Sequence, residues 1–384
     1  MLFRRHLLQA AAMAPLLGAA SGWALSPRVL QFPRDHGAHP ELRTEWWYLT
    51  GHAQTAAGRA FGFQVTFFRS RVDGTQAMTS RLAARQLLFA HAAITDVQGG
   101  KLWHDERIAR WNGAPGGAAD ASLQDTDVRL SGWSFQRQAE GYTTHITGDD
   151  LRLDLRAETT QPLLLQGHQG LSRKGPDAAQ ASHYYSQPQL VVSGSLGLQG
   201  QRFEVTGRAW LDHEWSEALL HPEAVGWDWI GMNLDDGGAL TAFQLRRADG
   251  SALWAGGSLR SPTDALPRVF APQELRFEPQ RHWTSPRTGA RYPVEWRLHS
   301  PAGAHTVRAQ VDDQELDARA STGNGFYMYQ LEGAANDPRK IASIRTILND
   351  YSQTTPERMQ MLAARYLVKD RSWRVAVMPE PKGR

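Results

Sequence analysis

The sequence predicts an all-β protein built as a sandwich or a barrel, and three observations lead to this fold class. Apolar and polar residues alternate over short runs along most of the chain, as they do in strands with one buried face. The chain of 384 residues contains 35 Gly and 20 Pro, many of them between these runs, where they favour turns. The runs also follow one another at the short spacing typical of antiparallel sandwiches and barrels.

Residues 1–24 are expected to be an export signal rather than part of the fold. Arg4 and Arg5 precede an apolar stretch rich in Ala and Leu, and small residues lead to a cleavage point near Ala24. The arginine pair resembles a twin-arginine signal, and an ordinary secretory signal is the alternative. Either interpretation predicts a bacterial protein that is periplasmic or secreted. No later stretch of sequence is long and apolar enough to predict a transmembrane helix.

The first predicted domain, residues 25–218, contains the clearest strand patterns. In residues 59–68, phenylalanine or valine occupies every second position, which predicts a strand with one apolar face. Residues 189–211 predict a β-hairpin that turns at Gly200-Gln201, because two alternating runs flank a glycine.

The second predicted domain, residues 219–333, continues the pattern in shorter runs, and a short helical connector over residues 216–224 is expected to lead into it. The periodicity then changes. In residues 334–384 apolar residues recur every three or four positions, which predicts a helical C-terminal extension. The strand runs of the second domain lie at 239–247, 252–260, 270–278, 292–299 and 304–311.

Charge and motifs exclude several classes of function. The formal net charge is only +3 and the basic residues are scattered among acidic ones, so nucleic-acid binding is not expected. The chain has no cysteine, which excludes disulfides, thiolate metal sites and a cysteine nucleophile. It also contains no HExxH motif and no GxSxG motif. We therefore expect neither a metal nor a cofactor.

The 14 Trp and 13 Phe are a large aromatic content for one chain. In the run GWDWIGM, Trp227 and Trp229 share one face of a predicted strand, and Asp228 lies on the other. These indoles can form part of a barrel core, or they can line a cavity for a long apolar ligand. The sequence leaves both interpretations open.

The run WLDHEWS, residues 210–216, is the strongest candidate for chemistry. On a strand, His213 and Trp215 share one face, whereas Asp212 lies on the other. If His213 faces a cavity it could protonate a double bond, and the Trp215 indole would stabilise the resulting cation. Asp212, brought round by a bulge, or Glu45 would orient the imidazole. The alternative is that His213 and Asp212 only cross-link strands at the domain junction.

Two other runs provide supporting residues. In EWWY, Glu45 and Trp47 share one face and Tyr48 lies on the other. Glu45 is then either a buried functional carboxylate or a strand-end residue that reaches solvent. Tyr185, in the run HYYS at the end of a long polar stretch, 167–186, could orient a water molecule at a cavity mouth or simply anchor that loop.

Several blocks together resemble the carotenoid 1,2-hydratase / AttH family of lipocalin-like predicted secreted hydrolases. The resemblance covers roughly residues 41–333, and the EWWY and DHEW blocks are its most specific parts. It rests on ELRTEWWYLTGH, GRAFGFQVTFFR, HYYSQPQLVVSGSL, GRAWLDHEWS, GWDWIGMNLDDGGALTAFQLRRADG and STGNGFYMYQLEG.

The resemblance implies two tandem lipocalin-like antiparallel β-barrels, residues 25–218 and 219–333, with a cavity at or near their junction. In the hydratase branch, water is added to a carotenoid double bond without a cofactor. This chain departs from that branch in one strand, where Ala242-Phe243-Gln244-Leu245 replaces an expected Tyr and acid. It also turns helical after the second barrel.

These observations lead to two main hypotheses and a minor one. The first is an exported protein that holds a polyene, isoprenoid or lipid-like ligand and performs hydratase-type acid–base chemistry. The second is a non-catalytic periplasmic carrier of the AttH type, and the third is a secreted hydrolase. The first hypothesis assigns catalysis to His213, Asp212, Trp215 and Glu45, and ligand binding to Trp47, Tyr48, Tyr185, Trp227 and Trp229.

Overall fold

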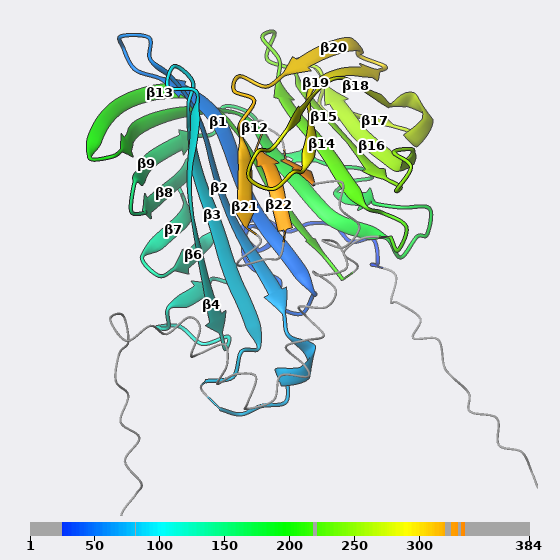
Figure 1. Cartoon of the computed structure of the whole chain (residues 1–384). Coiled ribbons are helices and arrows are strands. Elements are labelled where there is room, and N and C mark those ends of the chain that lie inside the picture. Colours follow the sequence, from blue (N-terminus) through cyan, green and yellow to red (C-terminus); the bar gives the residue numbers. More distant parts are fainter. Residues whose placement is uncertain (1–24, 81, 218–220, 319–323, 329–331, 335–384) are drawn as a thin grey trace, which may run out of the picture.

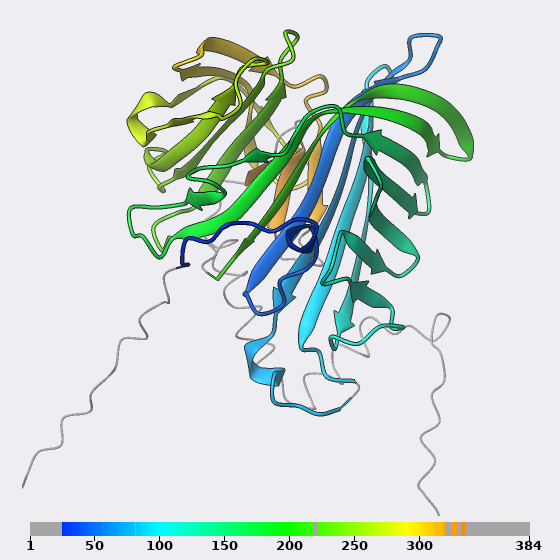
Figure 2. The ribbon, with the colours of Figure 1, turned by 180° about the vertical axis from the view of Figure 1, so that it is seen from behind.

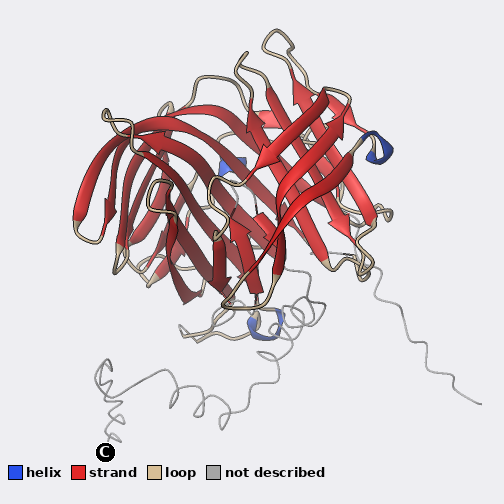
Figure 3. Cartoon of the chain, turned by 45° about the horizontal axis from the view of Figure 1, so that its top comes forward, coloured by secondary structure: helices blue, strands red, loops and turns tan. Residues whose placement is uncertain are grey.

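The structure, a computed structural model, describes residues 25–80, 82–217, 221–318, 324–328 and 332–334. The predicted export signal lies outside these residues, as does all but the first residue of the predicted helical extension. Strands dominate the described chain, as Figure 3 shows, and its helices are three short 3-10 turns: η1 (Arg34–His36), η2 (Asp73–Thr75) and η3 (Pro272–Glu274). Within this part of the chain, no helix has the length and apolarity needed to cross a membrane.

The first domain is a single antiparallel sheet of 13 strands. Its strands are β1 (Thr44–Gln54), β2 (Ala60–Arg71), β3 (Gln86–Asp96), β4 (Lys101–Trp111), β5 (Ala119–Ala121), β6 (Asp127–Leu130), β7 (Trp133–Gln138), β8 (Gly141–Thr147), β9 (Leu151–Glu158), β10 (Leu164–Leu165), β11 (Leu171–Arg173), β12 (Ala181–Leu198) and β13 (Gln201–Ser216).

This sheet curls into a nearly closed barrel (Figure 1). Its order is β4-β3-β2-β1-β13-β12-β9-β8-β7-β6-β5, and β10 and β11 both pair with β12. The end strands β4 and β5 contact each other, so the barrel is almost complete. Its interior is filled by alternate residues of these strands, including Trp47, Phe67, Leu153 and Leu211, all buried. The all-β, lipocalin-like fold class is therefore confirmed.

The longest hairpin, β12–β13, forms as the sequence predicts. Its turn falls one residue earlier, at Gln199-Gly200, where both residues have positive φ, 48° and 80°. Two successive left-handed residues suit the tight turns of twisted hairpins, and glycine adopts that conformation without steric cost.

The second domain contains two sheets. The first has the order β17-β16-β15-β14-β23-β22-β21 and the second the order β18-β19-β20. Bounds of these strands are β14 (Gly226–Asn233), β15 (Ala239–Arg246), β16 (Ala252–Arg260), β17 (Arg268–Phe270), β18 (Arg276–Thr284), β19 (Arg291–Ser300), β20 (Gly303–Arg308), β21 (Glu315–Ala318), β22 (Asn324–Met328) and β23 (Glu332–Ala334).

The connector between the domains differs from its prediction. Residues 221–225 form a turn, closed by a hydrogen bond from the Ala224 N–H to the His221 carbonyl, where a short helix was expected. Pro222 lacks the backbone N–H that a continuing helix would use. Residues 218–220 lie outside the described chain.

Strands β1, β12 and β13 form a wall that belongs to both domains. Because side chains alternate along a strand, one face of this wall fills the first barrel while the other packs against the second domain. Trp47 and Leu211 join the core of the barrel, whereas Tyr48 and Trp210 join the core of the second domain. Figure 2 shows the segment before β1, in dark blue, folding back beside that strand.

Candidate functional site

The inner face of the shared wall gathers the candidate residues in two rows. The strand register places Trp47, His213 and Tyr185 side by side on β1, β13 and β12. One step along the strands, Glu45, Trp215 and His183 form the next row. All six side chains are buried. We call this group, with Asp35, His36 and His39 from the segment before β1 and Arg69 from β2, the lumen cluster.

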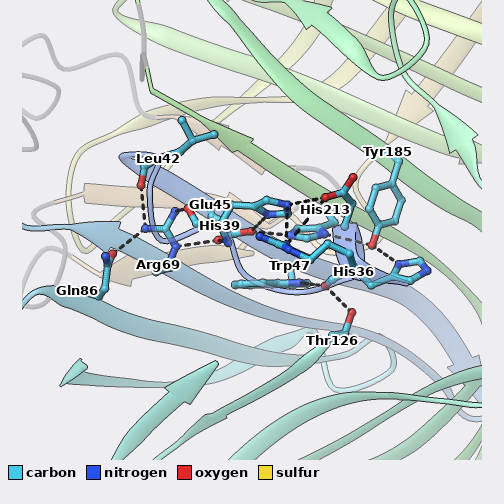
Figure 4. A network of polar contacts seen from close by, with 12 residues as sticks. His36, His39, Leu42, Glu45, Trp47, Arg69, Gln86, Thr126, Tyr185 and His213 are labelled. Atoms are coloured by element: carbon cyan, nitrogen blue, oxygen red, sulfur yellow. Dashed lines mark hydrogen bonds and ion pairs between the residues drawn. The ribbon is translucent and has the colours of Figure 1, made fainter. Parts of the chain in front are cut away.

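Glu45 is the centre of the lumen cluster (Figure 4). Its Oε1 lies 2.7 Å from His39 Nδ1 and 2.9 Å from His213 Nε2. Its Oε2 accepts hydrogen bonds from the His39 backbone N–H at 2.9 Å and from Arg69 Nε at 2.7 Å. The carboxylate is completely buried, and four donors meet its two oxygens.

Arg69 fixes the position of Glu45. Its guanidinium, also fully buried, donates to the carbonyls of Leu42 and His39 at 2.9 and 2.8 Å and to Gln86 Oε1 at 2.7 Å. Burial alone would raise the pKa of Glu45. The Arg69 charge and the His39 charge outweigh it and hold the pKa well below its ordinary value, so Glu45 is ionised.

His39 has surroundings that favour the imidazolium form. Its Nδ1 faces Glu45 Oε1 and its Nε2 lies 3.1 Å from Asp35 Oδ1, so each ring nitrogen has a carboxylate oxygen to which it can donate. The guanidinium of Arg34, whose Nη1 lies 3.3 Å from the same Nε2, opposes a charge on the ring. Burial opposes this charge, but Glu45 and Asp35 together raise the pKa of His39. The ring also stacks on the Trp215 indole, with centroids 4.0 Å apart and planes 4° from parallel. This arrangement adds a cation–π contact.

Asp35 is held as an anion on the other side of His39. Burial would raise the pKa of Asp35, but the hydrogen bonds from His39 and the Gln31 N–H, together with the charge of Arg28, lower it. Arg28 is partly exposed and lies 2.9 Å from Asp35 Oδ1. A line of alternating charges thus runs from the protein surface to Glu45.

His213 is neutral. Burial lowers its pKa to about 4, against the opposing effect of Glu45. Its Nε2 therefore donates to Glu45, and its Nδ1 accepts from the Tyr185 hydroxyl at 3.1 Å. The Tyr185 oxygen lies 2.7 Å from Nδ1 of His36, which burial also keeps neutral, with a pKa of about 3. The His213 ring stacks on the Trp47 indole, with ring centroids 4.7 Å apart, and its centroid lies at the same distance from that of Trp215.

The expectation that Asp212 orients His213 is wrong. No bulge interrupts β13 here, so the carboxylate faces the second domain, as strand alternation requires. Its Oδ1 accepts from Ser186 Oγ at 2.6 Å and from Trp210 Nε1 at 2.7 Å. Glu45, the other candidate, makes the contact with His213.

The outer face of the wall carries a second polar group, which we call the interdomain cluster. It contains Asp212, Glu214, Ser182 and Tyr184 from the wall, Lys174 from the segment after β11, and Trp227 and Phe243 from the second domain. Trp229 also reaches this face and donates from Nε1 to the Tyr184 hydroxyl at 3.0 Å. The predicted ligand-binding residues Tyr48, Trp227 and Trp229 lie here, whereas Trp47 and Tyr185 lie in the lumen cluster.

The segment before β1 supplies residues that sequence reasoning missed: Asp35, His36 and His39. They lie outside any periodic strand, so hydrophobic patterning gave no signal. The dense run of ionisable residues RDHGAH, separated from EWWY by five residues, was the available signal. The segment is tied to two parts of the barrel, because Trp47 Nε1 on β1 and Thr126 Oγ1, just before β6, both donate to the His36 carbonyl.

His39, Glu45 and His213 also form a set of metal-ligand type. One donor atom from each lies within 4.8 Å of the others, and all three side chains are buried. Two imidazoles and a carboxylate suit zinc and similar ions. A metal there would have to displace the protons that both imidazoles now share with Glu45.

Fold and site together define a two-domain, lipocalin-like β-barrel protein with a buried acid–base cluster. The chain belongs to the AttH-like family, which it matches over residues 24–336. This confirms the resemblance seen in the sequence. Among curated proteins, none matches the chain significantly.

Two solved structures resemble this one. The crystal structure of an AttH protein from Nitrosomonas europaea is 44% identical, with a TM-score of 0.73, and the match covers 81% of this chain and 97% of that one. The crystal structure of kievitone hydratase from Nectria haematococca is 13% identical, with a TM-score of 0.60, over 80% of this chain and 91% of that one. At that identity the second likeness extends to the fold alone.

Proposed function

We propose that this protein binds an apolar, polyene or isoprenoid ligand and adds water to one of its double bonds by cofactor-free acid–base chemistry in the lumen cluster. The observation that carries the proposal is the buried His39 ring between the Glu45 and Asp35 carboxylates, joined through Glu45 to the neutral His213. A stored proton next to neutral proton carriers, among indole rings, is what protonation of an alkene requires.

The contacts support one route for the proton. For this route His213 must leave its resting tautomer, with the proton on Nε2, for the tautomer with the proton on Nδ1. His39 Nδ1 then gives its proton to Glu45 Oε1, and Glu45 passes a proton to His213 Nε2. His213 Nδ1 then donates to the Tyr185 oxygen, and the Tyr185 hydroxyl hands its own proton on. Each step joins atoms 2.7 to 3.1 Å apart. His213 is therefore the relay and His39 the source.

The alkene takes this proton and becomes a carbocation, which the faces of Trp47 and Trp215 would stabilise by about 0.5–2 kcal/mol each. Water adds to the cation, and the proton it loses returns to the cluster. The sum is alkene plus water to alcohol, so neither an oxidant nor a cofactor is consumed.

We further propose that the protein is exported to the periplasm or secreted. The support is the sequence of residues 1–24, with its basic start, apolar stretch and small residues near Ala24. A fusion of these residues to a reporter that is active only outside the cytoplasm tests this point.

A non-catalytic carrier is the second candidate. Strand β15 favours it, because Ala242, Phe243, Gln244 and Leu245 provide neither the tyrosine nor the acid expected of the hydratase branch. The secreted hydrolase is weaker, because the hydrogen bonds of His213 within the described residues go to Glu45 and Tyr185 and not to a serine nucleophile.

Binding and turnover separate these candidates. An acyclic carotenoid in detergent is the probe, Trp fluorescence quenching reports binding, and mass spectrometry detects a product 18 Da heavier. We expect His213→Ala and His39→Gln to reduce turnover by about 10²- to 10⁴-fold while binding persists. His145→Ala is the matched control, since His145 pairs with Asp154 on the surface. Binding without product in the wild type would support the carrier.

A further inference from the structure

The interdomain cluster contains a buried amine. Lys174 is 6% exposed, whereas Lys101, the other lysine in the described chain, lies on an exposed position of β4. A buried lysine with an acidic neighbour is a familiar starting point for amine chemistry, because burial disfavours the charged form. The acid–base function proposed for the lumen cluster does not use this residue.

The Lys174 amine has few polar partners and many aromatic ones. Its Nζ lies 3.0 Å from Glu214 Oε1 and 3.2 Å from Ser172 Oγ. Three rings face it, with centroids 4.2 Å away for Phe243, 4.6 Å for Tyr184 and 5.4 Å for Trp227. Two of these rings come from the second domain. One carboxylate and an aromatic enclosure would stabilise an iminium cation as well as an ammonium.

The acids beside Lys174 suit proton exchange with it. Burial raises the pKa of Glu214, and burial lowers the pKa of Lys174, so a proton passes between them more readily than in water. Burial also raises the pKa of Asp212, on the same face of β13, to about 7. Lys174 and its two acidic neighbours thus form a buried set of proton donors and acceptors.

One donor in the cluster has no acceptor. The buried indole N–H of Trp227 finds no hydrogen-bond partner within the described residues. A buried N–H without an acceptor is costly, and an oxygen atom placed against it would relieve that cost. The chain reaches the surface two residues after Lys174, at Pro176, which is exposed.

We propose that Lys174 captures apolar aldehydes as a reversible imine. The ammonium gives a proton to Glu214, and the free amine adds to the carbonyl carbon to form a carbinolamine. The Trp227 N–H bonds the carbonyl oxygen during this addition. The carbinolamine then loses its oxygen as water, with a proton from an adjacent acid, and the iminium pairs with Glu214. Amine plus aldehyde gives imine plus water, so the step needs no redox partner.

Reductive trapping tests the proposal on the full-length protein. The probe is cinnamaldehyde with cyanoborohydride near pH 7, followed by digestion and mapping of labelled lysines by mass spectrometry. The reactive fraction of an amine rises about tenfold for each unit by which its pKa falls. Because burial lowers the pKa of Lys174, we expect cinnamaldehyde to label Lys174 more than Lys101, and to label Lys174 more than the polar aldehyde glyoxylate does.

Variants separate chemistry from folding. Lys174→Arg keeps a cation in the cluster and should abolish the main label, Glu214→Gln should slow its appearance, and Lys101→Arg should leave it unchanged. Circular dichroism and urea midpoints show whether each variant is folded. The comparison of the Lys174 and Lys101 labels in the wild-type protein tests the proposal without any variant. Equal labelling of both lysines, or a Lys174 label that appears only in urea, would overturn the proposal.

Discussion

The role of Arg69 gives the sharpest prediction about the lumen cluster. Replacing it by methionine keeps the aliphatic bulk but removes the charge that faces Glu45. Glu45 Oε2, the Leu42 and His39 carbonyls and Gln86 Oε1 would each lose a donor. Breaking a fully buried ion pair by removing one partner costs about 3–5 kcal/mol, because the remaining charge stays buried. We expect Arg69→Met to lose stability on that scale.

Urea unfolding followed by Trp fluorescence measures this loss. With a slope of about 3 kcal/mol per molar urea for a protein of this size, the midpoint should fall by about 1–2 M. Arg156→Met is the matched control, since Arg156 pairs with Glu158 on the surface and such pairs contribute about 0–1 kcal/mol. A midpoint for Arg69→Met no lower than that of Arg156→Met would refute the reasoning.

Three further predictions concern other parts of the wall and its clusters. The pKa of His39 is raised in the folded protein, so the charged ring stabilises the fold. This stabilisation is complete below the pKa of the unfolded chain, about 6.5, and is lost as the pH rises past the pKa of the folded protein. The stability advantage of the wild type over His39→Gln in urea should therefore shrink with rising pH, and a constant advantage would contradict the charged state. Trp229→Phe removes the donor to the buried Tyr184 hydroxyl and should cost about 1–3 kcal/mol by the same assay, and a neutral result would exclude that bond. Gly207→Ala should lower the melting temperature, because a Cβ there would lie 2.0 Å from the His52 carbonyl oxygen, whereas Gly62→Ala, whose Cβ would lie 3.4 Å from its nearest neighbour, is the tolerated control.

Strand alternation allowed much of this arrangement to be predicted from the sequence. It placed His213 and Trp215 on one face of their strand with Asp212 on the other, and Glu45 and Trp47 on one face of theirs, because side chains on a strand point alternately to its two sides. Which of these faces points inward was left open. The error was to allow a bulge that would bring Asp212 round, although Glu45 was available on the neighbouring strand.

The rest of the site could not be predicted because it depends on contacts across long sequence distances. Asp35 and His36 lie in the short turn η1 and His39 follows it, and no local rule places such a segment against a strand 149 residues away. Lys174 was missed for the same reason, since its burial comes from rings of the second domain. A polar loop in the sequence thus became part of a buried interface.

The protonation state of His39 is the central claim, and ¹⁵N NMR of the histidine rings tests it most directly. The chain has 14 histidines, and His39→Gln and His213→Ala assign the two signals that matter. At pH 7.5, above the ordinary pKa of about 6.5, the account predicts protons on both nitrogens of His39 and on only one nitrogen of His213. A neutral His39 ring at that pH would contradict the account, because the proposed source would then hold no proton to give.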